Sequence, residues 1–263
     1  MATAMAMDTV MATVMEMKKK SSLFYCFIPK KSAWQTDLLE GMTDIHSHYL
    51  PGVDDGMRTV DESVKALEEM RNRGVKHVYL TPHIMSELES NRPGFLRQQF
   101  SSLLQKAPEG IALRLAGEYM LDAAFDGQMK EGLLTLSDKY VLIEMSYMYP
   151  SPELNSVVYN LQVKGFQPII AHPERYMFME RADYTTLKEK GCLYQLNLLS
   201  LSGQYGKRAY DVAWYLLQHG FYDFAGTDIH SYRILREALE RLKLSLPEKN
   251  LIRSLIGRND LLW

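Results

Sequence analysis

Cysteine is scarce in this sequence, and its scarcity excludes several classes of protein. Only Cys26 and Cys192 occur among the 263 residues. A disulfide framework is therefore excluded, and neither cysteine belongs to a Cys-x-x-Cys pair of the kind that binds zinc or exchanges disulfides. This composition fits a reducing compartment such as the cytoplasm.

Long apolar runs are missing as well. No stretch approaches the roughly 18 to 20 residues that a membrane span needs. The nearest candidate, residues 23–28, is too short for a signal-peptide core and is followed by Pro29, Lys30 and Lys31 rather than by a small-residue cleavage site. We therefore expect no stable membrane insertion and a cytoplasmic location.

The chain has no excess of basic residues. Lys and Arg number 30 against 32 Asp and Glu, for a net charge of −2. The first 35 residues contain five lysines against Asp8 and Glu16, which makes them +3 and leaves −5 on the remainder. A domain of this sign lacks the electrostatic footprint of a nucleic-acid binder. We expect no nucleic-acid partner, and the charge suits a carboxylate site that binds cations.

Glycine-rich phosphate loops are also absent. Neither GxGxxG nor GxxxxGK[ST] accompanies an apolar run, which removes the usual dinucleotide and P-loop interpretations. Residues 1–35 are rich in Met, Ala and Thr and contain no glycine, a pattern that we interpret as a poorly ordered extension. With 46% hydrophobic residues in the whole chain, residues 36–263 can bury one large core and are expected to form one domain.

Within that domain, short apolar runs alternate with amphipathic segments of helical period. The expected strands are Met42–Ile45, His77–Thr81, Ile111–Ala116, Tyr140–Met145, Pro168–Ala171, Leu193–Leu196 and Asp223–Ala225. The expected helices are Asp61–Arg73, Pro93–Gln105, Pro152–Lys164, Asp183–Lys190, Arg208–His219 and Ile234–Lys243. Seven such units predict an α/β fold with a parallel sheet. At this length a barrel is favoured over an open doubly wound sheet, although the pattern alone does not decide whether the sheet closes on itself.

Residues of the types that bind metals stand at the ends of these strands. His46 and His48 follow the first strand, where alternation can point both side chains the same way. Others of this kind are His83 in LTPH, Glu118 in AGEY, Glu144, His172 in AHPER, and Asp228 with His230 in GTDIH. In parallel α/β folds the carboxyl ends of the strands converge on one face. We therefore expect these side chains to meet.

Their combination predicts bound metal. Any one of them alone is more often a satisfied core group or a helix cap. Neighbouring buried carboxylates, however, repel each other and lose their hydration. Five histidines and at least three carboxylates on one rim therefore predict more than one divalent ion, and the mixed nitrogen and oxygen ligands suit Mn, Fe or Zn better than Ca or Mg alone.

These motifs, in this order, resemble those of the PHP (polymerase and histidinol phosphatase) superfamily. More narrowly, DIHSHYLPGVDDG, TPH, HPER and GTDIH are similar to the tyrosine phosphatases of bacterial capsule and exopolysaccharide operons. The resemblance covers residues 42–235. It implies a distorted (β/α)7 TIM-like barrel, the PHP fold, with three metal ions per chain, most often manganese.

The resemblance also implies which residues hold each ion. The first ion would be bound by His46, His48, Glu118 and Asp228. The second would share Glu118 and add Glu144 and His172. The third would use Asp55, His83 and His230, with Asp54 as an adjacent alternative to Asp55.

The chemistry expected from these parts is hydrolysis of a phosphomonoester. A hydroxide that bridges two cations can attack phosphorus near neutral pH. Arg175 and Arg233, each three residues after a ligand histidine, can hold phosphate oxygens, although Arg175 has an alternative partner in Glu174. The resemblance places an arginine slightly further along the chain than Arg233, so Arg233 departs from the family pattern and Arg175 does not. Asp228 can also pass a proton.

An aryl phosphate is a plausible substrate, because tyrosinate with a pKa of about 10 leaves more easily than an alkoxide. Tyr49, Tyr119, Tyr147 and Tyr149 either line a cleft for the ring or simply pack in the barrel. No Cys-x₅-Arg loop is present, so a thiol-phosphate intermediate is not expected.

The sequence thus predicts a metal-dependent protein-tyrosine phosphatase whose partner is a phosphotyrosine protein, the tyrosine kinase of polysaccharide export. Two alternatives remain open. One is a phosphomonoesterase for a small molecule such as histidinol phosphate. The other is a metal-stabilised binding module without turnover.

Overall fold

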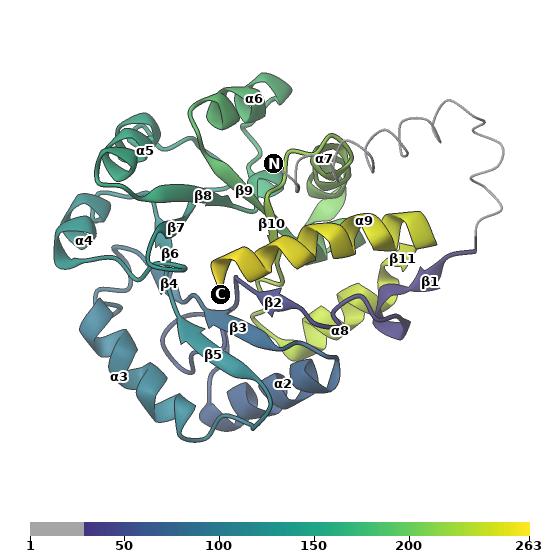
Figure 1. Cartoon of the computed structure of the whole chain (residues 1–263). Coiled ribbons are helices and arrows are strands. Elements are labelled where there is room, and N and C mark those ends of the chain that lie inside the picture. The colour runs from purple at the N-terminus through teal and green to yellow at the C-terminus, as the bar shows by residue number, and fades with distance from the viewer. Residues whose placement is uncertain (1–28) are drawn as a thin grey trace.

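A computed structural model of the chain describes residues 29–263. Its parallel strands curl into an incomplete ring, and most of the helices surround that ring (Figure 1). The described part has eight α-helices: α2 (Val60–Asn72), α3 (Pro93–Leu104), α4 (Phe125–Glu131), α5 (Leu154–Val163), α6 (Arg181–Glu189), α7 (Gly206–Gln218), α8 (Tyr232–Arg241) and α9 (Leu246–Ile256). The predicted α/β class is confirmed.

The parallel strands form two sheets. Six strands pair in the order β10 (Phe224–Gly226), β9 (Leu193–Asn197), β8 (Gln167–Ala171), β7 (Tyr140–Glu144), β6 (Glu118–Met120) and β4 (His83–Ile84). Three more pair in the order β2 (Thr43–Asp44), β3 (His77–Leu80) and β5 (Ala112–Leu115). The architecture is therefore a curled parallel sheet covered by helices, and the strand pairing does not form a single closed ring of seven strands.

The second and third predicted strands are each broken in two. β3 is followed by β4 after Thr81 and Pro82, and proline cannot donate a ladder hydrogen bond. β5 is followed by β6 after Gly117, where a Cβ atom would lie 2.5 Å from Cδ1 of Ile84. His83 and Glu118 consequently begin the second pieces, whereas we had expected them to follow complete strands.

The first and last strand regions also come together. Ser47 forms an isolated parallel bridge with Ile229. The amide of Asp228 donates to the carbonyl of His46 at 2.8 Å, and the amide of His48 donates to the carbonyl of Ile229 at 3.0 Å. These bonds place the His-x-His and Asp-x-His motifs beside each other at the carboxyl end of the ring.

Apolar side chains occupy both surfaces of the curled sheet. Along β7, Leu142 packs with Ile169 in a small cluster, whereas Val141 and Ile143 join the large cluster that includes buried residues of the helices. This alternation is the period of two expected of a strand buried on both faces. The same alternation places Glu144 on the face of the sheet that Leu142 occupies, at the carboxyl end of the strand.

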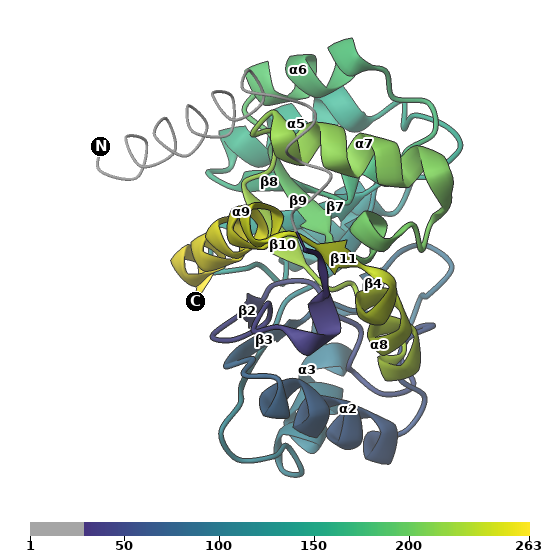
Figure 2. The same cartoon turned by 90° about the vertical axis from the view of Figure 1, so that its right-hand side faces the viewer.

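The C-terminal segment covers the end of the ring where the strands begin. α9 and the 3₁₀ helix η5 (Gly257–Leu262) cross this end (Figures 1 and 2). The Asn259 amide donates to the carbonyls of Thr43 and Ala225 at 2.7 and 2.6 Å. The hydroxyl of Tyr79 donates to the carbonyl of Leu262 at 2.6 Å. One end of the ring is thus covered by protein, and the metal-binding residue types gather at the other.

Two helices were missed from the sequence. α4 is short and contains Gly127, which weakens its helical pattern. α9 begins with a capping box in which Ser245 and Glu248 satisfy each other's backbone amides. Its Ser-x-x-Glu pattern was a usable signal that we did not apply.

The start of the ordered domain also differs from the expected boundary. Residues 31–35 were assigned to the extension, but β1 (Lys31–Ser32) pairs antiparallel with β11 (Lys243–Leu244), and the side chain of Ala33 is buried. Residues 1–28, the rest of the expected extension, lie outside the described residues.

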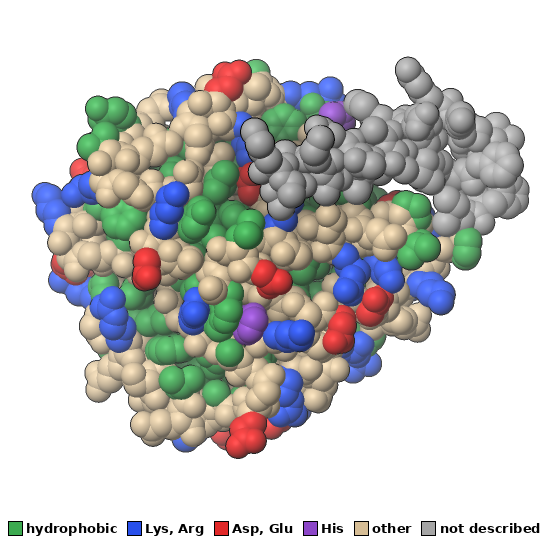
Figure 3. All heavy atoms as spheres, in the orientation of Figure 1, with side chains coloured by type: hydrophobic (Ala, Val, Ile, Leu, Met, Phe, Trp, Pro, Cys, Tyr) green, Lys and Arg blue, Asp and Glu red, His purple; other side chains and the backbone are tan. Residues whose placement is uncertain are grey.

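No helix in the described range is both long and apolar enough to cross a membrane. On the face seen in Figure 3, lysine and arginine side chains are interspersed with aspartate and glutamate.

Candidate metal centre

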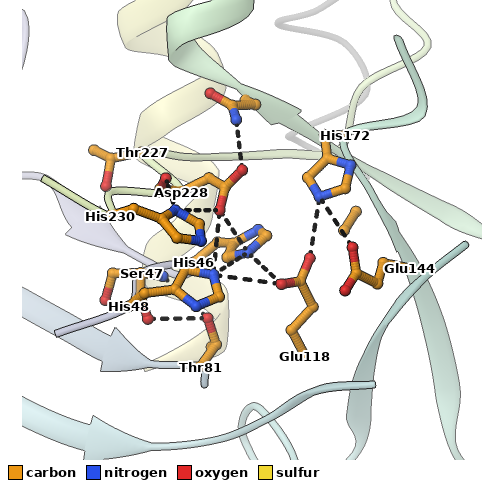
Figure 4. Close-up of polar contacts among 12 residues, drawn as sticks. His46, Ser47, His48, Thr81, Glu118, Glu144, His172, Thr227, Asp228 and His230 are labelled. Atoms are coloured by element: carbon orange, nitrogen blue, oxygen red, sulfur yellow. Dashed lines mark hydrogen bonds and ion pairs between the residues drawn. The ribbon is translucent and has the colours of Figure 1, made fainter. Parts of the chain in front are cut away.

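His46 and His48 present the same ring nitrogen to the centre of the site. The Nδ1 of His46 donates to Gln195 Oε1 at 2.9 Å, and the Nδ1 of His48 donates to Asp54 Oδ2 at 2.8 Å. Each imidazole therefore keeps the lone pair of Nε2 free, as a metal ligand requires. The two Nε2 atoms lie 3.3 Å apart (Figure 4).

Two carboxylates complete the first group. Glu118 Oε2 lies 3.2 Å from His46 Nε2 and 3.4 Å from His48 Nε2. Asp228 Oδ1 lies 3.3 and 3.2 Å from the same two nitrogens. All four side chains are buried. For metal–nitrogen distances of about 2.0–2.1 Å, tetrahedral geometry separates two ligand atoms by about 3.3 Å, so the four atoms are spaced as ligands of one ion would be.

A second group lies beside the first around Glu118 and Glu144. His83 Nδ1 is 3.0 Å from Glu118 Oε2 and 2.9 Å from Glu144 Oε1. His172 Nε2 is 3.1 Å from Glu118 Oε1 and 3.9 Å from Glu144 Oε2. Glu118 thus faces both groups, as expected. The set of ligand atoms that lie within 4.8 Å of one another here consists of His83, Glu118 and Glu144, with His83 in place of the predicted His172.

The third group lies nearer the surface. Asp55 Oδ1 is 3.4 Å from His83 Nε2 and 3.2 Å from His230 Nε2, and His48 completes the set. A neutral imidazole has a single lone pair. His83 can therefore serve only one of the two groups that it touches. If it serves this group, His172 is the nitrogen that remains for the second.

The two adjacent aspartates have different surroundings. Asp54 is absent from all three sets of ligand atoms. Its carboxylate binds His48 Nδ1 and accepts from the amides of Gly56 and His83 at 3.0 and 3.1 Å. Asp55 is exposed and turns one oxygen to the third group. The geometry therefore favours Asp55 as the ligand and gives Asp54 the task of orienting His48.

Several buried atoms of the site have no hydrogen-bond partner. Among the described residues, those whose atoms lie in the three ligand sets are His83 Nδ1, Glu118 Oε2, Glu144 Oε1 and Asp228 Oδ1; His172 Nδ1 also lacks a partner. A buried polar atom left without a partner destabilises a folded protein by about 1–3 kcal/mol, and more when it is charged. The four atoms that belong to the ligand sets lie within 4.8 Å of the other ligand atoms of their set, so the donor set fits divalent cations.

The electrostatics of the site also call for positive charge. Burial opposes protonation of His46, but the carboxylates of Glu118 and Asp228 outweigh it and raise the pKa of the imidazole. Burial and the charge of His83 oppose protonation of His48, yet Asp54 and Asp228 hold its pKa well above the usual value. Despite burial, the charges of His46 and His83 hold the pKa of Glu118 well below its usual value. The carboxylates of the site thus favour positive charge between them, from imidazole protons or from a cation.

Two residues of the site have left-handed backbone conformations. His172 has φ 32° and Asp228 has φ 49°. Such angles are uncommon outside glycine and are stable only where the surrounding structure enforces them. Here they turn both side chains from the strand ends into the site.

Arg175 lies between two aromatic rings at the edge of the metal groups. Its guanidinium carbon is 4.3 Å from the centre of the Tyr147 ring and 4.0 Å from that of Tyr205. Its Nη1 donates to Asp228 Oδ2 at 2.9 Å. The alternative pairing with Glu174 is wrong, because that carboxylate accepts from Asn197, Ser200 and Tyr222.

A cavity of about 290 Å³ opens over Arg175 and the third metal group. Its lining residues are Asp55, His83, Tyr147, Arg175, Leu199, Gln204, Tyr205, Asp228, Ile229, His230, Ser231 and Ile234. Arg233 is not among them and its side chain is exposed on α8. Of the four tyrosines considered from the sequence, only Tyr147 lines the cavity; Tyr49 and Tyr119 are buried in the core and Tyr149 is largely exposed.

Sequence reasoning missed two residues that position the site. Gln195 and Asn197 lie two apart on β9, the strand without a predicted ligand. Asn197 Nδ2 donates to Asp228 Oδ2 at 2.7 Å and to Tyr205 at 3.1 Å. The usable signal was a pair of amide side chains at alternate positions near the carboxyl end of an apolar strand.

Comparison with known proteins gives a consistent result. Tyrosine-protein phosphatase YwqE of Bacillus subtilis is 30% identical over 204 residues, which are 73% of this chain and 78% of that protein. The putative tyrosine-protein phosphatase CapC of Staphylococcus aureus is 28% identical over 201 residues, 72% of this chain and 77% of that protein.

A solved structure supports the same relationship. It comes from work on YwqE of Bacillus subtilis and CpsB of Streptococcus pneumoniae, described as unique metal-dependent tyrosine phosphatases. Its TM-score with this chain is 0.72 at 26% identity, covering 84% of this chain and 94% of that one. The family model described as "Capsular polysaccharide synthesis, CpsB/CapC" matches residues 42–246. This chain therefore belongs to the CpsB/CapC family of capsular polysaccharide synthesis.

Proposed function

We propose that this protein is a metal-dependent protein-tyrosine phosphatase that acts on a tyrosine kinase of polysaccharide export. The observation that carries the proposal is the overlap of three groups of metal-binding side chains near Arg175, of which Asp55, His83, Asp228 and His230 line one cavity together with Arg175. The activity named for the relatives supports the reaction, and the family's connection with capsular polysaccharide supports the partner.

The donor set suits three divalent transition ions, with manganese favoured and iron or zinc as alternatives. We assign His46, His48, Glu118 and Asp228 to the first ion. We assign Glu118, Glu144 and His172 to the second, and Asp55, His83 and His230 to the third. Bound there, such cations would acidify water into a nucleophile near neutral pH and clamp the oxygens of the phosphoryl group.

Arg175 is the side chain that we assign to binding the phosphate group, in addition to the metal ions. Asp228 accepts a hydrogen bond from one guanidinium nitrogen, and the rings of Tyr147 and Tyr205 restrict the position of the guanidinium plane. The remaining N–H groups form a fork that matches phosphate oxygens, which the point charge of a lysine cannot copy. Arg175 can therefore bind the dianion without first losing much side-chain freedom.

Asp228 acts as a fixed anion in this scheme. Although burial opposes ionisation, the nearby His46 and His48 hold the pKa of Asp228 below its usual value. It is therefore ionised at neutral pH and has no proton to donate to the leaving group. Departing tyrosinate, with a pKa of about 10, needs less help from an acid than an alkoxide does.

The apolar part of the cavity suits a phenyl ring. Leu199, Tyr205 and Ile234 line it together with Tyr147. Its volume of about 290 Å³ is at the low end of the roughly 300–1,000 Å³ typical of ligand cavities. One phosphorylated side chain fits this space.

The experiment is hydrolysis of a phosphotyrosine peptide by the full chain with Mn²⁺, with and without chelator. We expect turnover that chelator abolishes and added Mn²⁺ restores. Arg175→Lys should lower kcat/KM by about tenfold or more, because a lysine makes no bidentate contact. Activity that resists the chelator would contradict the proposal. Bound metal without any turnover would indicate a binding module.

A substrate panel tests the alternative of a small-molecule phosphomonoesterase. It compares kcat/KM for phosphotyrosine peptide, p-nitrophenyl phosphate and histidinol phosphate. We expect the peptide to be preferred over histidinol phosphate, since the apolar wall packs against a phenyl ring but would remove hydration from a charged ammonium group. The reverse order would favour the alternative.

Three finer aspects belong to the same proposal. We propose that the curled sheet is a distorted (β/α)7 barrel, supported by the bridge from Ser47 to Ile229. We propose that residues 36–263 make up one phosphatase domain. We also propose a cytoplasmic location, because protein tyrosine phosphorylation consumes ATP and the chain has only two cysteines.

A further inference from the structure

An exposed apolar surface borders the cavity on the side of Tyr147. We call it the ledge and define it as Tyr147, Met148, Tyr149 and Met177. Tyr147 is 36% exposed, Met148 54%, Tyr149 72% and Met177 54%. Because Tyr147 also lines the cavity, the ledge is continuous with the site.

The two loops that form the ledge are tied together and to a helix. The amide of Met177 donates to the carbonyl of Tyr147 at 2.8 Å. Arg208, near the start of α7, donates to the carbonyl of Met177 at 2.8 Å. The rings of Tyr147 and Tyr176 stack with centroids 6.3 Å apart. The ledge is therefore held in a defined position beside the cavity.

The composition of the ledge is unusual for an exposed segment. Residues 145–152 read MSYMYPSP and contain no charged residue, in a chain of which 24% of residues are charged. Exposed apolar patches of this kind mark interaction sites. Tyrosine gives broad contact area with few rotatable bonds, and methionine adapts to varied apolar partners.

The size of the cavity places the rest of a protein substrate on its rim. A space of about 290 Å³ accepts one phosphorylated side chain, so the backbone that carries this side chain must remain outside. An extended chain advances about 3.3–3.6 Å per residue. The residues next to the phosphotyrosine therefore pass over whatever borders the opening, and on one side that border is the ledge.

We propose that the ledge binds apolar side chains within two residues of the phosphotyrosine, on an extended segment of the protein substrate. This inference rests on the proposed function and adds a sequence preference to it. A charged neighbour would lose hydration against the ledge and find no partner of opposite charge within residues 145–152.

The test compares two phosphotyrosine peptides with p-nitrophenyl phosphate on the Mn²⁺-loaded full chain. One peptide has Leu or Val at the two positions on each side of the phosphotyrosine, and the other has Ser and Asp there. We expect the wild type to prefer the apolar peptide through a lower KM. In a Tyr149→Ala, Met177→Ala double variant, kcat/KM for the apolar peptide should fall about tenfold, as expected for the loss of two partly buried apolar contacts.

Three controls separate the ledge from general damage. Turnover of p-nitrophenyl phosphate should not change in the double variant, because neither residue lines the cavity. Tyr159→Ala removes a tyrosine that is 66% exposed on α5 and does not line the cavity, and it should leave both peptides unaffected. The Ser and Asp peptide should respond little to either variant.

The outcomes distinguish this inference from the proposed function. Equal wild-type turnover of the two peptides, or an unchanged apolar preference in the double variant, would overturn the proposal that the ledge binds substrate. Either result would leave the proposed phosphatase activity standing. A parallel loss on peptide and p-nitrophenyl phosphate would also overturn it, since the variant would then have damaged the site. Failure of the wild type to hydrolyse any phosphotyrosine peptide would refute both.

Discussion

At the scale of single residues, the site depends on which nitrogen of each histidine faces inward. His46 is held by the neutral amide of Gln195, whereas His48 is held by the carboxylate of Asp54. Both partners accept from Nδ1, so the lone pairs of the two Nε2 atoms point to one place. Outer partners of this kind fix the tautomer and the ring orientation of a metal ligand.

Replacing Gln195 tests this arrangement. In Gln195→Leu the Nδ1 of His46 loses its acceptor, and the amide of His172, 3.4 Å from the same oxygen, loses one too. We expect Mn²⁺ affinity to fall about 10–100-fold. Gln195→Glu restores an acceptor and should recover part of the loss. Calorimetric titration of Mn²⁺ measures both, and equal affinities for the leucine variant and the wild type would contradict the assigned role.

The two adjacent aspartates should respond differently to substitution. Asp55→Asn removes a charged ligand of the third group, so bound metal measured by elemental analysis should fall from about three ions per chain to about two. Asp54→Asn keeps the hydrogen-bond shape near His48 and should keep the ion count while weakening affinity. The same ion count in both variants would contradict the assignment of Asp55 as a metal ligand and Asp54 as the residue that orients His48.

At the scale of secondary-structure elements, the site consists of strand ends and interruptions. β4 and β6 begin with His83 and Glu118, directly after the breaks at Pro82 and Gly117. β9 contributes no predicted ligand but holds two ligands in place through Gln195 and Asn197. At the opposite end, α9 and η5 cover the strand starts, so changes there should affect stability rather than chemistry.

The cap of α9 gives a test at this scale. Ser245→Ala removes a hydroxyl that bonds both the backbone and the side chain of Glu248. We expect a loss of about 1 kcal/mol and a melting temperature lower by about 2–4 °C, with kcat/KM unchanged. Ser101→Ala, on the exposed surface of α3, is the matched control and should melt as the wild type does. A loss of activity in Ser245→Ala without a change in stability would contradict the view that this end of the ring serves stability and the opposite end serves chemistry.

At the scale of the whole molecule, the buried carboxylates need compensating charge. Without metal, that charge comes from imidazoles with raised pKa values at His46, His48 and His83. Metal ions would replace those protons with fixed charge and would occupy the orphaned atoms. Folding stability and metal content should therefore be linked.

Removal of metal should lower the melting temperature. A ligand that binds only the folded state stabilises it by about 4.1 kcal/mol at 1,000 times its dissociation constant. The chelated protein should melt several degrees lower, and added Mn²⁺ should restore the wild-type curve. Calorimetry with matched Mg²⁺ as the control checks the metal preference. Identical melting with and without chelator would contradict tight binding.

Loading with metal should also release protons. Since the neighbouring carboxylates raise the pKa values of His46, His48 and His83 above the usual value in the metal-free protein, these imidazoles hold more protons than free imidazole does at the same pH. Imidazole must be neutral to bind metal, so protons leave on binding and affinity rises with pH. Titration of Mn²⁺ into weakly buffered, chelator-stripped protein, followed with a pH indicator, measures the release. Binding without proton release would be inconsistent with these charge states.

The sequence by itself determined the alternation of strands and helices and the ordered set of ligand types. That His46, His48, Glu118 and Asp228 meet on one rim could be predicted, because parallel strands bring their carboxyl ends together; their assignment to one ion came from the resemblance to the PHP superfamily. α9 could also have been found from its capping box, a local signal that needs no tertiary contact.

Only the tertiary structure decided the contacts between distant segments. The partner of Arg175 is Asp228 rather than its neighbour Glu174, and Asp55 rather than Asp54 faces the third group. Gln195 and Asn197 gain their roles from strands beside their own. Local sequence sets backbone preference and side-chain alternation, whereas the partner of each side chain depends on how the sheet curls and where its strands break.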